Sequence, residues 1–141
     1  MKNLKSIMLG LALLMVCSAA MADKPRPGIL TKNHAINTYI DAMTRGKLSG
    51  VNDILDQNAT FSTLRGKQVL SFGKQDMLKY LKENKDIDMD CTTNTSVIQS
   101  NADITLVKVD MKYETAVRCS YITLVNTGEG WKITNVYSVI R

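Results

Sequence analysis

The change of hydrophobic period along the chain is the feature that most constrains its fold. After Asp86 the sequence alternates between apolar and polar residues in four long segments, with turn signals at 100–101, at Glu114 and at 127–130. Alternation with a period of two is typical of strands that bury one face. Because the connections are short, the strands should run antiparallel as a meander. The four expected strands span 88–99, 103–113, 116–126 and 131–140.

The region before Asp86 has helical spacing instead. Apolar residues at Ile36, Tyr39 and Met43 share one helical face, and Thr31 and Gly46 are suited to begin and end that helix. A short second helix is expected over 51–57. A third helix is expected to start after Gly73 and to run to about Glu83.

Between the second and third helices, alternation around Ala59 and a turn at 65–67 predict a hairpin of two short strands. The order is therefore helix, helix, hairpin, helix and four long strands. This order predicts the α+β class, with three helices gathered on one face of a curved antiparallel sheet. Such an arrangement leaves a cavity between helices and sheet.

Residues 1–22 have the form of a secretory signal peptide. Lys2 and Lys5 precede an apolar run, and Ala20 and Ala22 provide the small residues of a cleavage site. Removal of these 22 residues from the 141-residue chain would leave 119 residues, enough for one domain. We expect a flexible leader over 23–30, a single domain over 31–141, and a periplasmic or secreted protein. The apolar run is short for a bilayer span, and none follows it, so no integral membrane segment is expected after cleavage.

The charge pattern does not indicate a nucleic-acid-binding protein. The signal segment holds two of the 18 basic residues and none of the 13 acidic ones, which leaves a net charge of +3 after cleavage. The remaining basic residues are scattered and are not interleaved with aromatic residues that could stack on bases. A solvated polar surface is the expected role of these charges.

Three cysteines occur, and Cys17 would leave with the signal peptide. Lipidation of Cys17 is disfavoured because Val16 is not small and an ordinary cleavage site follows. Counting from the turns places Cys91 and Cys119 on either side of the middle strand, near Met111 and Asp110. Two strand spacings separate them by about 9–10 Å, too far for a disulfide. We predict two free thiols.

The closing segment carries a family resemblance. Tyr121-Ile-Thr-Leu124, a glycine-containing turn, and Trp131-Lys-Ile-Thr-Asn135 followed by Tyr137 resemble the ending of the nuclear transport factor 2-like superfamily. The resemblance covers about Lys32 to the end and is closest to the exported bacterial "putative lumazine-binding" branch. It implies a cone-shaped fold with an apolar pocket at its open end, and a homodimer formed through the outer face of the sheet. On elements that face the cone in this superfamily, the candidate pocket residues are Tyr39, Met43, Phe61, Tyr80 and Trp131.

Enzymes of this superfamily place an acid or base inside the cone, and this sequence offers weak candidates. His34, the one histidine, should point away from the apolar helical face. Asp110 shares its strand parity with Lys108 and Lys112, which favours a polar outer face. No histidine or cysteine cluster indicates a metal, and no glycine-rich loop indicates a nucleotide cofactor.

These observations favour a non-catalytic exported module that dimerises and holds a small apolar or aromatic ligand. One alternative is an isomerase, dehydratase or hydrolase that uses Asp110 or Asp90 as the base, assisted by Tyr113. A second alternative is a protein-interaction partner whose sheet face binds another exported protein. The candidate interface residues for a homodimer or such a partner are Tyr121, Thr123, Thr134 and Tyr137.

Overall fold

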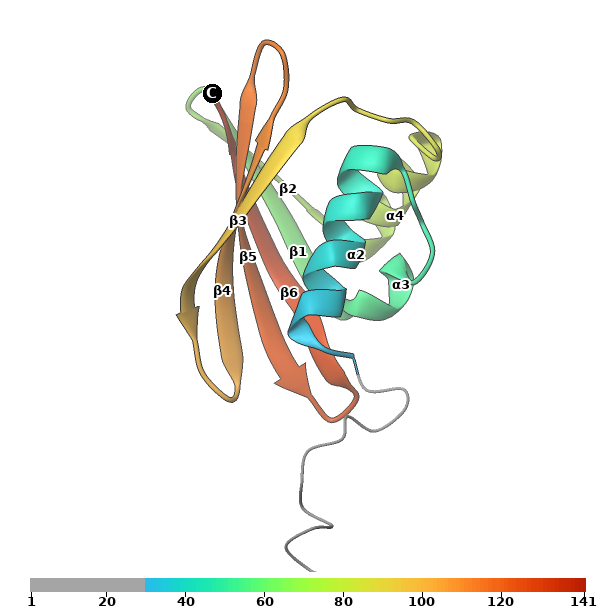
Figure 1. The fold of residues 1–141 in the computed structure, drawn as a ribbon, viewed down its shortest axis with the longest axis vertical. Coiled ribbons are helices and arrows are strands. Elements are labelled where there is room, and N and C mark those ends of the chain that lie inside the picture. The colour runs from blue at the N-terminus through green and yellow to red at the C-terminus, as the bar shows by residue number, and fades with distance from the viewer. Residues whose placement is uncertain (1–29) are drawn as a thin grey trace, which may run out of the picture.

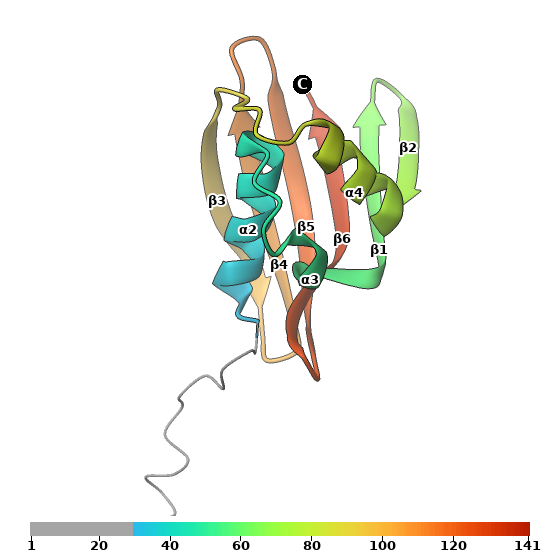
Figure 2. The ribbon, with the colours of Figure 1, turned by 90° about the vertical axis from the view of Figure 1, so that its right-hand side faces the viewer.

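The chain folds into a curved six-stranded sheet with helices on one face (Figures 1 and 2). The computed structural model describes residues 30–141, so the expected signal peptide, Cys17 and the leader up to residue 29 lie outside the described residues. The helices are α2 (Lys32–Arg45), α3 (Val51–Ile54) and α4 (Lys74–Glu83). The strands are β1 (Leu55–Arg65), β2 (Gln68–Gly73), β3 (Thr92–Ser100), β4 (Ile104–Lys112), β5 (Val117–Thr127) and β6 (Gly130–Ile140).

The sheet order is β2-β1-β6-β5-β4-β3. β3 to β6 form the expected antiparallel meander, and β1 and β2 form the expected hairpin. β1 joins the meander in parallel to β6, and the long chain between these two strands, through β2, α4 and β3 to β5, makes the parallel pairing possible. The predicted α+β class with three helices on the concave face is confirmed for the part of the chain that the structure describes.

The ends of α2 follow from local chemistry. The side chain of Thr31 accepts a hydrogen bond from the backbone N–H of His34 at 3.2 Å, and so satisfies one free donor of the first turn. Gly46 ends the helix with φ of +64°. A Cβ at Gly46 would lie 2.4 Å from the backbone oxygen of Asn84, so this position also requires glycine for space. Here α2 contacts the connection between α4 and β3.

The expected extent of the second helix, 51–57, is wrong. Helix α3 ends at Ile54, and Leu55 is already extended, with φ −95° and ψ 128°, where it pairs with Ile133 of β6. The short apolar pattern is compatible with both helix and strand, and pairing of Leu55 with β6 decided the outcome. β3 likewise begins at Thr92 instead of residue 88, because Asp90 has a positive φ of 45° that breaks the strand.

The core lies between the concave face of the sheet and the helices. Strand β4 shows the pattern clearly, since Val107, Val109 and Met111 are fully buried and alternate with half-buried polar residues. Phe61 stacks between Tyr39, with ring centroids 6.5 Å apart, and Phe72, at 5.8 Å. These contacts join α2 to the β1–β2 hairpin. No helix within residues 30–141 is long and apolar enough to cross a membrane.

Candidate functional site

A hollow of about 230 Å³ opens at the end of the molecule where β5 begins. It lies between the β1–β2 hairpin, α4 and β5, and its lining combines aromatic, apolar and basic side chains. Figure 2 shows α4 crossing the sheet at this end. The lining residues are Thr63, Arg65, Leu70, Phe72, Met77, Tyr80 and Arg118.

Arg118 is the charged group that β5 directs toward this hollow. Arg118 lies on the same face of β5 as the buried residues Ser120 and Ile122, and Tyr121 lies on the opposite face. The side chain of Arg118 is therefore on the helix side of the sheet. Its Nε atom is buried and has no hydrogen-bond partner within the described residues. Within the same residues, its guanidinium makes no ion pair with a carboxylate. The guanidinium of Arg118 therefore has donor groups that could pair with an external anion.

The hydroxyl of Tyr39 is a second buried polar group with no partner in residues 30–141. Tyr39 is fully buried, and burial raises its pKa from 10.0 to about 12, against a smaller lowering by the charge of Arg118. Tyr80 and Tyr113 add to the increase. Tyr39 therefore remains a neutral phenol at physiological pH, able to donate or accept a hydrogen bond close to the Arg118 charge.

Small polar side chains continue the β5 face below Arg118. Ser120 lies two residues further along, and its hydroxyl is 2.8 Å from that of Ser138 on β6, with both residues buried. Because the two hydroxyls satisfy one another, neither needs the guanidinium as a partner.

Of the five candidate pocket residues, one lines the hollow and the other four lie elsewhere. Tyr80, 39 % exposed, lines the hollow directly. Tyr39 and Phe61 lie behind it, connected through Phe72, while Met43 is buried in the core. Trp131 lies at the opposite end, where Lys32 Nζ is 4.6 Å from the ring centroid.

Sequence reasoning did not select Arg118, Phe72 or Met77. The signal for Arg118 was its parity with Ser120 and Ile122, which places an arginine on the buried face of a strand. Phe72, at the end of β2, and Met77, on α4, both line the hollow.

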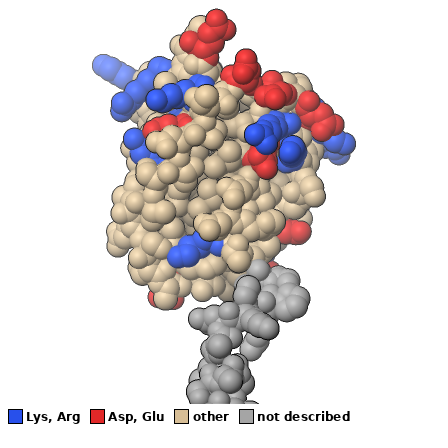
Figure 3. Space-filling model, viewed as in Figure 1, with Lys and Arg blue, Asp and Glu red and all other residues tan. Residues whose placement is uncertain are grey.

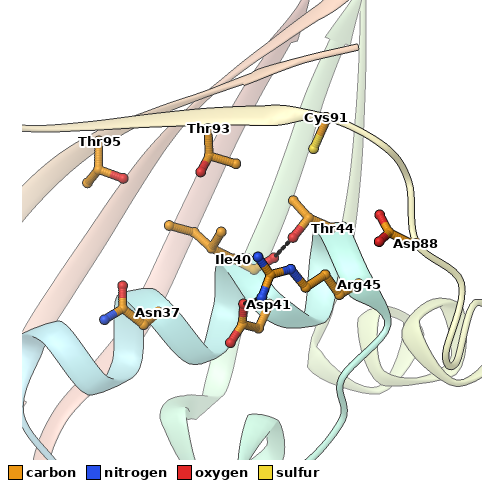
Figure 4. Close-up of a pocket in the computed structure, with 9 residues that line it drawn as sticks. All are labelled: Asn37, Ile40, Asp41, Thr44, Arg45, Asp88, Cys91, Thr93 and Thr95. Carbon is orange, nitrogen blue, oxygen red and sulfur yellow. Dashed lines mark hydrogen bonds and ion pairs between the residues drawn. The ribbon is translucent and has the colours of Figure 1, made fainter.

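A second hollow, about 380 Å³, lies between α2 and β3 (Figure 4). Thr93, Thr95 and Cys91 face α2 across it, and Asp41 and Arg45 pair at 3.7 Å on the helix. The hydroxyl of Thr44 donates to the carbonyl of Ile40 at 2.7 Å. The full lining is Asn37, Ile40, Asp41, Thr44, Arg45, Asp88, Cys91, Thr93 and Thr95.

Cys91 and Cys119 are both free, as predicted. Cys119 pairs in register with Asp110 as expected, whereas Cys91 precedes β3 and lies beside Tyr113 instead of Met111. Burial raises the pKa of both thiols, with Asp88 adding to the effect at Cys91 and Asp110 at Cys119. Both thiols are therefore weak nucleophiles at neutral pH.

The residues considered for catalysis lie away from the hollow. His34 is exposed on α2. Asp110 is on the outer face of β4, 3.6 Å from Lys108, so the alternative in which it acts as a base inside the cone is wrong. Asp90 is exposed in the connection before β3. No group of three His, Cys, Asp or Glu side chains between residues 30 and 141 is arranged to hold a metal ion.

Charged side chains are unevenly distributed over the face shown in Figure 3. They gather toward the end that also carries the C-terminus, while much of the remaining visible face is uncharged. The hollow beside Arg118 belongs to this same end of the sheet.

Solved structures with the same fold come from several bacteria. An NTF2-like protein of unknown function from Silicibacter pomeroyi has 20% identity and a TM-score of 0.66, covering 77% of this chain and 92% of its own. An NTF2-like protein of unknown function from Methylobacillus flagellatus has 13% identity and a TM-score of 0.60, covering 77% and 88%. An NTF2-like protein of unknown function in nutrient uptake from Rhodospirillum rubrum has 16% identity and a TM-score of 0.57, covering 77% and 97%.

At these identities the structures establish the fold alone. No curated protein matches the sequence. The family described as "Putative lumazine-binding" matches residues 31–138, which is nearly the whole region that the structure describes. The chain therefore belongs to the "Putative lumazine-binding" family, and its fold is that of the NTF2-like solved structures.

Proposed function

We propose that this protein is an exported, non-catalytic module that holds a small molecule with an apolar or aromatic body at the end of the cone where β5 begins. The observation that carries the proposal is the hollow itself, in which Phe72, Met77 and Tyr80 offer apolar and aromatic contacts around one opening. Pockets for small ligands typically combine such a lining with a few fixed polar groups. The family description supports a small-ligand role in the same direction.

Export is supported by the signal-like sequence of residues 1–22. The non-catalytic part rests on the lining of the hollow, whose titratable side chains are Arg65, Tyr80 and Arg118. General acid–base chemistry normally uses a group that titrates near neutral pH beside the substrate. The base named in the enzyme alternative, Asp110, faces the other side of the sheet.

We further propose that two copies associate through the outer face of the sheet. Tyr121 and Tyr137 are directly opposite one another on β5 and β6 and are 38 % and 37 % exposed. Beside them the charges of Lys108 and Asp110 already pair, which lowers the electrostatic penalty for covering this face. Tyrosine is enriched in protein interfaces.

Native mass spectrometry of protein purified from its export compartment tests both parts. A species of twice the chain mass that carries a reproducible small additional mass is expected. Tyr121→Glu should yield monomer, while the control Thr93→Glu, on the helix side of exposed β3, should remain dimeric. A bare monomer from wild-type protein would argue against both the ligand and the dimer.

A further inference from the structure

The hollow beside β5 contains an arginine, Arg118, whose side chain forms no hydrogen bond with another residue between 30 and 141. Arg118 shares the lining with Arg65, and no acidic side chain is among the lining residues. Asp110, on the neighbouring strand β4, belongs to the outer face and is paired with Lys108 at 3.6 Å. Within residues 30–141, neither Arg65 nor Arg118 forms an ion pair with a carboxylate.

The buried atom of Arg118 indicates how an anion would bind. Nε and one terminal nitrogen of a guanidinium present two parallel N–H groups, which match the two oxygens of a carboxylate or phosphate. The Nε atom of Arg118 is buried and has no partner in the part of the chain that the structure describes, although buried donors are normally satisfied. The unpartnered hydroxyl of Tyr39 lies within the influence of the same charge.

We infer that Arg118 is an oxyanion-binding residue and that the ligand of the hollow is a small molecule with an apolar or aromatic ring and a carboxylate or phosphate group. The ring would contact Phe72, Met77 and Tyr80, while the oxyanion would pair with the Nε side of Arg118. This inference rests on the proposed function, because it defines the chemical class of the ligand for the same hollow. Arg65 is exposed at the rim of the hollow. In this inference Arg65 attracts the anion by its charge, and Arg118 forms the hydrogen bonds that hold it.

The test uses three probes of similar shape: benzoate, phenyl phosphate and the neutral benzamide. Protein obtained by expressing the full chain is titrated with each probe by NMR, following the amides of Thr63, Phe72 and Arg118. We expect an oxyanion probe to bind at least about tenfold more tightly than benzamide, as a charge-assisted bidentate pair requires. The tighter of benzoate and phenyl phosphate identifies the oxyanion.

Substitutions locate the effect. Arg118→Gln should bring benzoate, phenyl phosphate and benzamide within about twofold of one another, and Arg118→Lys should restore part of the preference because it keeps the charge without the planar fork. Lys112→Gln removes the same charge from an exposed position on neighbouring β4 and should leave the preference unchanged. Thermal unfolding of each variant confirms that it is folded.

Equal binding of benzamide and benzoate in the hollow would overturn the anion inference while leaving the proposed ligand-binding function standing. A preference that survives in Arg118→Gln, or the absence of binding by both oxyanion probes, would also overturn it. The proposed function has its own readout, since a neutral co-purified molecule in the native mass spectrum would support it without Arg118. The two proposals can therefore fail separately.

Discussion

Tyr39→Phe is expected to make the protein more stable. The Tyr39 side chain is fully buried between α2 and the hairpin, and its hydroxyl has no hydrogen-bond partner within the described residues. A buried donor left without a partner costs about 1–3 kcal/mol, whereas an apolar group of the same shape does not carry that penalty. Because phenylalanine keeps the stacking on Phe61, the free energy of unfolding at pH 7 should rise by about 1 kcal/mol.

The same substitution should have a larger effect at alkaline pH. Burial raises the pKa of Tyr39 from 10.0 to about 12, so above pH 10 the unfolded chain loses this proton before the folded protein does. Stability then falls as pH rises from 10 to 12, by about 1.4 kcal/mol at pH 11. Tyr39→Phe lacks this proton, so its advantage over wild type should widen by that amount between pH 9 and pH 11.

Urea unfolding followed by far-ultraviolet circular dichroism measures both differences, with the slope against urea compared between variants. Tyr80→Phe is the matched control at pH 7, because Tyr80 is 39 % exposed and its change should stay within about 0.5 kcal/mol. If Tyr39→Phe instead lowers stability by 1 kcal/mol or more, the hydroxyl has a partner and the reasoning is refuted. An advantage that does not change between pH 9 and pH 11 would refute the electrostatic part alone.

Three further results are expected. Gly46→Ala should lower the free energy of unfolding by about 2–4 kcal/mol in urea, because φ is +64° and backbone of the α4–β3 connection lies 2.4 Å from the new Cβ; Gly66→Ala, with φ +62° and open space, should lose only about 1 kcal/mol, and equal losses would contradict the steric argument. Phe61→Ala should cost about 3–5 kcal/mol in the same assay by opening the stack behind the hollow, and a loss under 1 kcal/mol would show that the core refills the space. Thiol titration of the unfolded chain after signal removal should find two free groups, Cys91 and Cys119, which in the folded protein react faster as pH is raised; a titre of zero would indicate a disulfide.

Much of the fold could be predicted from the sequence because each element carries its own signal. Thr31 and Gly46 bound α2 through local backbone chemistry, and the β4 alternation of apolar and polar residues matches the observed burial. The end of α3 could not be predicted this way. Leu55 has no strong local preference for helix or strand. Its extended conformation depends on pairing with Ile133, which is 78 residues further along the chain.

The candidate site was harder to predict, for a related reason. Strand parity indicates which face a side chain occupies, and it places Arg118 inward and Asp110 outward. It does not indicate whether another element supplies a partner, and for Arg118 that depends on how α4 and the hairpin close over this end of the sheet. Trp131 shows a second limit of strand parity. Its side chain faces inward, but it lies beside Lys32 at the end of the sheet away from the hollow.

The two unpartnered groups also connect stability with function. Native proteins seldom keep a buried hydroxyl and a buried guanidinium nitrogen unsatisfied, and exceptions concentrate at sites that bind something. If Tyr39 and Arg118 are kept for a ligand, their replacement should raise the stability of the free protein while lowering its affinity for an oxyanion probe. A Tyr39→Phe protein that is more stable and binds benzoate unchanged would assign the anion to Arg118 alone and leave the Tyr39 hydroxyl outside the site.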